Sequence, residues 1–214
     1  MEMHEKFFYR LGDGWNIGGT GIKNRPIYKR TLEEYPNTIL SEYLKSARKK
    51  HDVKLMSQII DEYVLKNNIQ CNDTWNFHIR LGDVIDNSKH SVDAHFNKSL
   101  PSEGDGLGGR FYIEPREYFL KKIKKAKKTL KLESVTLYSS YHGLCKSNKK
   151  TIDYLKKVID LFNDNGIKVT KQINNLDIDL DFVTLCKSKY FTHTNGGFSR
   201  LVTRMVNYYN NCII

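Results

Sequence analysis

The sequence predicts an α/β fold in which parallel strands alternate with helices. From Ser134 onward, short apolar segments typical of strands alternate with amphipathic segments typical of helices, and short connections join them. Upstream, residues 74–83 carry an apolar side chain at every second position and reach Gly82, where the chain can turn without the steric cost of a Cβ. Strands separated by helices usually pair in parallel, so this order predicts a largely parallel sheet.

The N-terminal part of the chain is predicted to be mostly helical. Helices are expected within residues 31–66, the second of them over 53–66. The first carries an apolar stripe made of Leu40, Tyr43, Leu44 and Ala47. Before these helices, residues 12–21 form a glycine-dense loop. Such a loop either lets backbone amides approach a phosphate or is a plain connector.

The strand within residues 74–83 has two different faces. Its apolar side chains face one side, and His78 and Arg80 share the other. Arg80 and Asp83 therefore come to the end of the strand, where α/β folds place their ligands. A guanidinium is always charged, and its planar fork fits a phosphate. The alternative is structural, because Arg80 can also pair with Asp83 or Asp86 and fix the turn.

Residues 84–113 form a long connection, and connections of this length are often functional. His90, Asp93 and His95 lie in it, but nothing else in the chain supports a metal site, so a surface loop is expected there. A mobile lid is the alternative. The next helix, over 115–130, begins with a proline and carries six lysines. This lysine face is either solvated or binds anions.

The C-terminal half repeats the strand–helix pattern. The expected elements are strand 135–138, helix 150–163, strand 167–170, a helix beginning at Asp181, strand 190–194, and a last helix with a stripe of Phe198, Leu201, Val202, Met205 and Val206. Gly166 is expected to end the first of these helices, and Ile152 is among the residues predicted to face the core. An Asp at the start of a helix is a common N-cap, and that is one interpretation of Asp181.

A second candidate site element is the turn Thr194–Arg200, which joins the last long strand to the last helix. Gly196 and Gly197 expose backbone N–H groups at a helix N-terminus, where the helix dipole favours an anion. Asn195 and Ser199 can add side-chain donors. The alternative is an ordinary helix start in which Asn195 or Ser199 is the N-cap.

Composition limits the class of protein. The chain has 214 residues, is 39% hydrophobic and carries a net charge of +11. Its charge suits an anionic partner, such as nucleic acid, a membrane surface or a nucleotide sugar, without choosing among them. No stretch reaches the roughly 20 apolar residues of a membrane span, and the N-terminus has no apolar signal core. A cytoplasmic protein with free thiols and no stable membrane insertion is therefore expected. No two of its cysteines form a Cys-x-x-Cys pair, which argues against zinc and thioredoxin chemistry.

The run His78–Asp83 resembles the His-x-Arg-x-Gly-Asp motif of fucosyltransferases that use GDP-fucose, especially the bacterial α-1,2-fucosyltransferase family. Further family-like segments follow in order over roughly residues 74–206. They are Glu117–Ile123, Leu137–Tyr141, Asp181–Cys186 and Asn195–Ser199. The chain departs from the family at Leu81, Leu185, Gly196 and Gly197, and it lacks the Trp-rich tail.

The resemblance implies a GT-B-type glycosyltransferase. Residues 71–214 would be its Rossmann-like GDP-sugar-binding domain, and residues 1–70 a shortened N-terminal region on the acceptor side. It also implies inverting transfer of fucose to a glycan hydroxyl, with GDP-fucose as co-substrate and without a metal or other cofactor.

Site roles follow from the same resemblance. Arg80 would clamp the β-phosphate, and the turn would donate hydrogen bonds to the diphosphate from Asn195, Gly196, Gly197, Phe198 and Ser199. Asp83 is the candidate base, with Asp86 behind it, although either can instead orient Arg80. His78 would support the strand end or touch the nucleotide. Asp181 would recognise guanine.

Other functions stay open at this stage. The donor sugar can be another GDP-sugar, such as GDP-rhamnose, because contacts to guanine and phosphate do not distinguish hexoses. Asp177 and Asp179 begin overlapping Asp-x-Asp triplets that can hold Mn²⁺ against a UDP-sugar. A basic nucleic-acid-binding protein is the competing class, but no recognition motif for nucleic acid is present, and none is expected as a partner. A catalytically inactive sugar-binding relative is a further alternative. The acceptor and the oligomeric state are not predicted.

Overall fold

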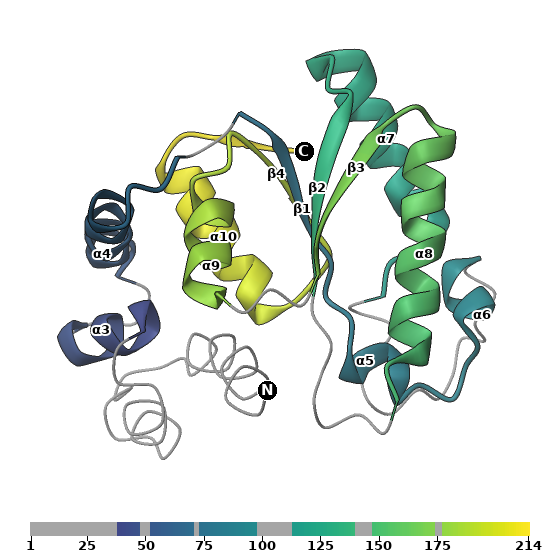
Figure 1. Ribbon diagram of the computed structural model, residues 1–214, viewed down its shortest axis with the longest axis horizontal. Coiled ribbons are helices and arrows are strands. Elements are labelled where there is room, and N and C mark those ends of the chain that lie inside the picture. The colour runs from purple at the N-terminus through teal and green to yellow at the C-terminus, as the bar shows by residue number, and fades with distance from the viewer. Residues whose placement is uncertain (1–37, 48–51, 71–72, 98–112, 140–146, 174–176) are drawn as a thin grey trace.

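A central sheet of five parallel strands organises the protein (Figure 1). The computed structural model describes residues 38–47, 52–70, 73–97, 113–139, 147–173 and 177–214. The strands are β1 (Trp75–His78), β2 (Ser134–Ser139), β3 (Lys168–Ile173), β4 (Tyr190–His193) and β5 (Cys212–Ile213). Every neighbouring pair is parallel, as the alternation of strands and helices predicted.

The strands lie in the order β3-β2-β1-β4-β5. The chain therefore starts in the centre with β1, moves outward to β3, and then crosses back to β4 on the other side of β1. This is the strand order of a Rossmann-like sheet, and the predicted α/β architecture is confirmed. The direction of winding reverses between β1 and β4. In open parallel sheets, ligands bind beyond the strand ends at this reversal.

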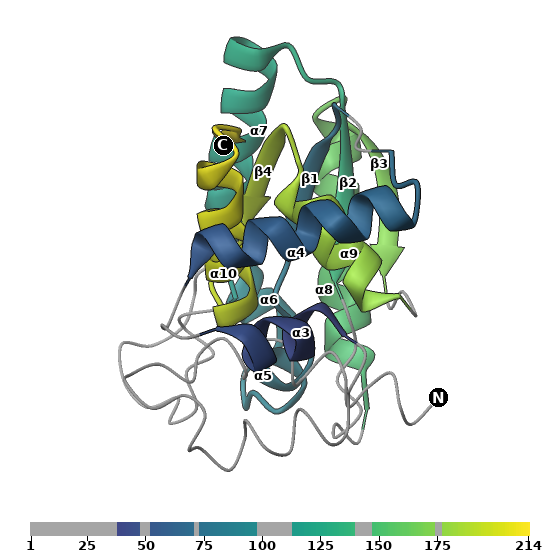
Figure 2. The same ribbon diagram turned by 90° about the vertical axis from the view of Figure 1, so that its left-hand side faces the viewer.

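Helices cover both faces of the sheet (Figure 1). One face carries α5 (Asp83–Asp86), α6 (Val92–Phe96), α7 (Arg116–Leu130) and α8 (Lys149–Asp164). The other carries α9 (Ile178–Cys186) and α10 (Gly197–Tyr208), with α3 (Ile39–Ser46) and α4 (Val53–Lys66) packed outside them. Figure 2 shows α4 crossing in front of α9 and α10.

The apolar alternation of β1 decides which face each side chain covers. Trp75 and Phe77 pack into the layer of α7 and α8, where the Phe77 ring centroid lies 5.6 Å from that of Phe119 and the Trp75 centroid lies 5.5 Å from that of Phe162. His78 points to the opposite layer, towards α10. Both faces of β1 are buried, as expected for a central parallel strand.

The N-terminal helices share a core with the sheet. The predicted stripe on α3 is buried, and Met56 and Ile60 of α4 pack in the same apolar cluster as Phe182 and Phe198. The described part of the N-terminal region is therefore helical, as predicted. The domain boundary at residue 70 stays a prediction, and the glycine-dense loop over 12–21 lies outside the described residues.

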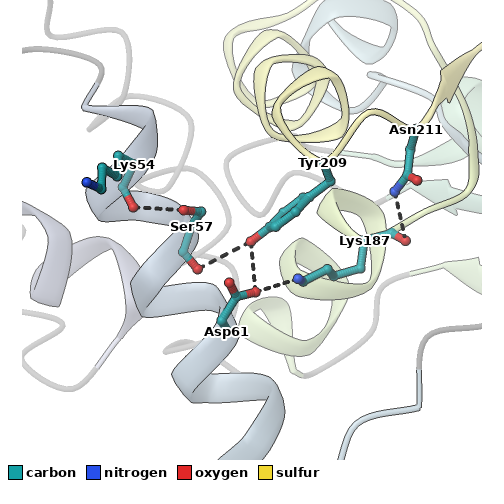
Figure 3. Close-up of polar contacts among 6 residues, drawn as sticks. All are labelled: Lys54, Ser57, Asp61, Lys187, Tyr209 and Asn211. Atoms are coloured by element: carbon teal, nitrogen blue, oxygen red, sulfur yellow. Dashed lines mark hydrogen bonds and ion pairs between the residues drawn. The ribbon is translucent and has the colours of Figure 1, made fainter.

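A polar network fixes α4 to the ends of α9 and α10 (Figure 3). Lys187 Nζ forms an ion pair with Asp61, and it lies 3.6 Å from the centroid of the Tyr209 ring. The Tyr209 hydroxyl donates to Asp61 Oδ1 at 3.0 Å and to the Ser57 carbonyl at 3.2 Å. Three helices that are distant in sequence therefore meet at one carboxylate.

Three sequence-based expectations need correction, and one strand was not predicted. Ile152 is 50% exposed rather than part of the core, because α8 buries the neighbouring Thr151 instead. The connection after β1 contains two short helices, α5 and α6. Helix α9 begins at Ile178, so Asp181 does not lead it. Strand β5 was not predicted, because a segment of two residues is too short to be recognised in the sequence.

Candidate functional site

The candidate site lies beyond the ends of β1 and β4, where the direction of winding reverses. The Thr194 backbone N–H donates to the His78 carbonyl at 3.0 Å, which extends the pairing of the two strands. The Arg80 N–H then donates to Thr194 Oγ1 at 2.8 Å. These bonds hold the two chain segments side by side. Sequence reasoning did not assign this role to Thr194.

Arg80 and Gly196 are in direct proximity. A Cβ built on Gly196 would lie 3.6 Å from Arg80 Cγ and 3.8 Å from Arg80 Cδ, so the stem of the arginine passes along the glycine backbone. The Arg80 guanidinium is half-buried, and its Nη1 donates to the Leu81 carbonyl at 2.6 Å. The structure thus brings the predicted strand-end arginine to the predicted glycine turn.

The start of α10 has no side-chain cap. Its N-cap is Gly196, with φ 140° and ψ 158°, a conformation nearly exclusive to glycine. The alternative interpretation, in which Asn195 or Ser199 caps this helix, is therefore wrong. Gly197, Phe198 and Ser199 form the first turn, whose N–H groups have no partner inside an α-helix. Such a turn favours an anion.

His78 and Ser199 form a buried pair beneath this turn. His78 Nδ1 and Ser199 Oγ are 2.8 Å apart, and the His78 ring centroid lies 4.8 Å from that of Phe198. Burial, reinforced by the charges of His193 and Arg80, lowers the pKa of His78 to about 3. The imidazole is therefore neutral near pH 7 and links β1 to α10. Since Ser199 is fully buried in this pair, its hydroxyl faces β1, and its role as a diphosphate donor stays a prediction.

Asn195 is exposed at the edge of the site and points to a carboxylate that sequence reasoning missed. Its Nδ2 donates to Glu114 Oε1 at 3.4 Å. Burial raises the pKa of Glu114, while the nearby Lys122 lowers it. No sequence signal identified Glu114, because it lies 81 residues from Asn195 and immediately precedes α7. A carboxyl group with a raised pKa is suited to proton transfer.

The turn after β1 uses its acidic residues differently. Gly82 adopts φ 71°, and its N–H donates to Thr151 Oγ1 at 3.1 Å. Asp86 Oδ1 accepts from the Thr151 N–H at 3.1 Å, and Asp86 Oδ2 accepts from its hydroxyl at 2.5 Å. Asp86 therefore caps α8, which argues against its predicted role as a reserve base. The backbone of Asp83 begins α5, but its side chain lies outside the described part of the structure, so its role stays a prediction.

The three aspartates at the start of α9 lie in different surroundings. Asp177 Oδ1 caps the helix at the Leu180 N–H, 2.9 Å away, which makes Asp177 rather than Asp181 the N-cap. Asp179 Oδ2 accepts from the Ile39 N–H at 3.2 Å, and burial raises the pKa of Asp179 to about 7. Asp181 is 9% exposed and close enough to Tyr138 to raise the pKa of that hydroxyl, after the larger effect of burial.

The alternative metal sites receive no support in the described part of the chain. Among those residues, no three His, Cys, Asp or Glu side chains are grouped so that they could hold a metal ion. In the connection after β1, His95 Nε2 lies 2.7 Å from Ser88 Oγ, and Asp93 forms an ion pair with Lys157 at 2.9 Å. Metal-independent chemistry stays a prediction.

Comparisons with known proteins find only distant structural similarity. The sequence matches no protein-family model, and no curated protein matches it. Among solved structures, the apo-form of POFUT1 aligns with a TM-score of 0.44 and 15% identity, covering 90% of this chain and 59% of POFUT1. POFUT1 in complex with GDP-fucose aligns with a TM-score of 0.39 and 12% identity, covering 87% of this chain and 56% of POFUT1. The chain thus spans less than two thirds of the POFUT1 structures, and we rest no argument on a likeness this distant.

No helix in the described ranges combines the length and the apolar character that crossing a bilayer requires.

Proposed function

We propose that this chain binds a GDP-sugar and transfers its sugar, fucose in the first instance, to a glycan hydroxyl. The observation that carries the proposal is the contact between Arg80 and Gly196 at the reversal point of the sheet. There the stem of an arginine lies beside an uncapped helix N-terminus, and a guanidinium and a helix N-terminus both favour a phosphate. A diphosphate bound at this place would meet the guanidinium and the first N–H groups of α10.

In the proposed reaction, the acceptor oxygen attacks the anomeric carbon of the sugar. The bond between that carbon and the β-phosphate oxygen breaks, and GDP leaves with the electron pair, so the configuration inverts. Negative charge grows on the departing diphosphate, and Arg80 with the N–H groups of Gly197 and Phe198 would stabilise it. The Arg80 fork must then turn from the Leu81 carbonyl to the phosphate. No metal is needed in this scheme.

Two carboxylates are candidates for the acceptor proton. Asp83 follows the motif strand directly, and Glu114 lies beside Asn195 with a raised pKa. We favour Glu114, because its contact with the turn brings it to the proposed diphosphate site. Asp181 is the candidate for guanine recognition. Its neighbour Phe182 packs on Phe198 with ring centroids 5.8 Å apart, so α9 is held against the turn of α10.

Calorimetric titration of the full chain with GDP, UDP and GDP-fucose, with EDTA present, tests the proposal. We expect binding that selects GDP over UDP. Replacing Arg80 by Ala removes charge-assisted hydrogen bonds worth about 1.5–3 kcal/mol, so GDP affinity should fall by roughly 10- to 150-fold. Arg204→Ala is the matched control. Arg204 is exposed on α10, and its replacement should leave GDP affinity unchanged.

Three results would overturn the proposal. One is the absence of nucleotide binding. A second is UDP binding that appears only when Mn²⁺ is restored, which would favour a metal-dependent transferase. The third is equal weakening by Arg80→Ala and Arg204→Ala, because the effect would then be general charge rather than a phosphate contact.

A further inference from the structure

Helix α7 carries a continuous stripe of lysines on its outer side. Lys121 lies four residues before Lys125, and Lys124 lies four residues before Lys128, so the four lie along one face, and all four are exposed. Like charges at these spacings destabilise a helix. Glu117 is the only acidic residue in α7, and none of the ion pairs between described residues includes a lysine of this helix. Among the described residues, the stripe therefore has no carboxylate partner, and Lys125 Nζ donates only to the Ile213 carbonyl, at 3.4 Å.

A hollow with an apolar floor lies next to the stripe, between α7 and the end of α8. Its volume is about 500 Å³, with Leu120 and Ile123 among its lining residues. The other lining residues are Lys124, Lys127, Lys128 and Asn165. Lys127 Nζ is fixed at one side by donating to the Asn165 carbonyl at 2.7 Å. Cationic groups thus surround a small apolar surface.

This surface lies away from the candidate site. Helix α7 begins near the ends of β1 and β4, where the Tyr118 hydroxyl donates to the His193 carbonyl. The helix then runs toward the N-terminal ends of the strands, and its C-terminal part projects beyond them at the top of Figures 1 and 2. The lysine stripe is therefore available to a large, flat partner without blocking the site.

We propose that the lysine stripe of α7 docks the protein on an anionic phospholipid surface. Four ammonium groups in a row match a plane of lipid phosphates, and clusters of four to eight basic residues on one helix are typical of such binding. The apolar floor of the hollow suits the acyl region just below the headgroups. A single-stranded nucleic acid fits less well, because its binding sites usually add stacking aromatic rings, and no aromatic side chain lines the hollow.

Co-sedimentation with lipid vesicles tests this proposal on the full chain. The vesicles contain phosphatidylcholine alone or with about one third phosphatidylglycerol, and we expect binding only to the anionic vesicles, weakened by high salt. A stripe variant replaces Lys121, Lys124, Lys125 and Lys128 by Gln. Each lysine near an anionic surface contributes roughly fivefold in partitioning, so the loss of four should lower partitioning by roughly 600-fold.

A second variant controls for net charge. It replaces four exposed lysines elsewhere by Gln, namely Lys54, Lys66, Lys89 and Lys171. It carries the same charge as the stripe variant, and we expect less than about a fivefold loss of binding from it. Circular dichroism confirms folding of both variants, since Gln is a good helix former. A charge-retaining stripe variant with four Lys→Arg replacements should bind like the original chain.

The outcomes separate the proposal from its rivals. Failure of the original chain to bind anionic vesicles would overturn it, as would equal losses in the stripe variant and the control. Tight binding of single-stranded RNA by the stripe, without vesicle binding, would assign the surface to nucleic acid instead. None of these results depends on whether the chain binds GDP.

Discussion

At the scale of single residues, the site is built from side chains that hold one another before any ligand arrives. The stem of Arg80 lies along Gly196, and His78 is bonded to Ser199 from below. In the proposed function, the held stem of Arg80 would lose little conformational entropy on binding, and its fork would exchange the Leu81 carbonyl for the phosphate. Two predictions follow from this arrangement, one for Arg80 and one for His78.

Replacing Arg80 by Lys should lower turnover by roughly 100-fold or more. Lysine keeps the charge but loses the planar fork that contacts two phosphate oxygens together. The measurement is release of GDP from GDP-fucose in the presence of a glycan acceptor, with Arg204→Lys as the control. Near-normal turnover of Arg80→Lys would remove Arg80 from the proposed mechanism.

Burial of His78 makes stability depend on pH. Its pKa is about 3 in the folded protein and near 6.5 when unfolded, so between these values the unfolded state binds more protons. The free energy of unfolding should therefore fall as pH falls below 6.5, by up to about 1.4 kcal/mol per pH unit from this residue, and should not depend on it above that pH.

Urea unfolding over this pH range measures the slope, and His78→Gln removes the contribution. Burial also lowers the pKa of His193, so part of the slope will remain in the variant. An identical slope in both proteins would show that His78 is not held neutral in the folded state.

At the scale of elements, the junctions of helices with strands matter most. Helix α8 is capped by Asp86 and α9 by Asp177, whereas α10 begins at Gly196 without a side-chain cap. Helix α7 also begins without a side-chain cap, but α10 is the helix that begins at the reversal point, beside Arg80. At their other ends, α9 and α10 are both linked to α4 through Asp61 (Figure 3).

Gly196→Ala should destabilise the protein by about 1–3 kcal/mol. The added methyl group would meet Arg80 only at ordinary contact distance, so the cost comes from the backbone conformation, which is strained for any residue with a Cβ. Gly197→Ala is the control, because it lies within α10 and should be neutral or stabilising. Chemical denaturation compares the two. Equal stability of both variants would contradict this account.

Removing the Tyr209 hydroxyl should loosen α4. Tyr209→Phe loses the bonds to Asp61 and to the Ser57 carbonyl but keeps the ring over which Lys187 lies, so we expect a loss of about 1 kcal/mol. Tyr208→Phe is the matched control, since Tyr208 is the exposed neighbour on α10. The free energies of unfolding of the two variants test this prediction. Equal effects would mean that the network contributes nothing measurable to stability.

At the scale of the whole molecule, two apolar clusters lie on opposite faces of the sheet. Helices α3 and α4 complete the cluster that contains α9 and α10. Helix α4 covers the outer side of α9 and α10, so these helices would expose apolar surface without it. An exposed patch of that kind is a site of aggregation or dye binding.

A fragment comprising residues 71–214 should therefore be less stable than the full chain. Fluorescence of a dye that binds exposed apolar surface, together with thermal unfolding, tests this expectation. We expect strong dye binding and a lower Tm for the fragment. A fragment that unfolds at the same temperature as the full chain, without binding the dye, would instead make residues 71–214 an independent domain.

Local signals in the sequence determined much of this protein. Period-two alternation predicted β1, the proline before Arg116 predicted the start of α7, and Gly166 predicted the end of α8. Such signals depend on the backbone preferences and spacing of adjacent residues, so they can be recognised without knowing the fold. The grouping of Arg80 with the glycine turn was expected only from the resemblance to fucosyltransferases.

Only the tertiary structure decided which side chains meet. His78 and Ser199 are 121 residues apart, Glu114 and Asn195 are 81 apart, and Asp86 reaches Thr151 across the ends of two elements. No spacing rule connects such pairs, because they depend on strand order and on how each helix lies on the sheet. The same reason explains Ile152, where a small rotation of α8 decided which neighbours were buried. The sequence by itself determined the elements and the charged groups at their ends, and packing determined their partners.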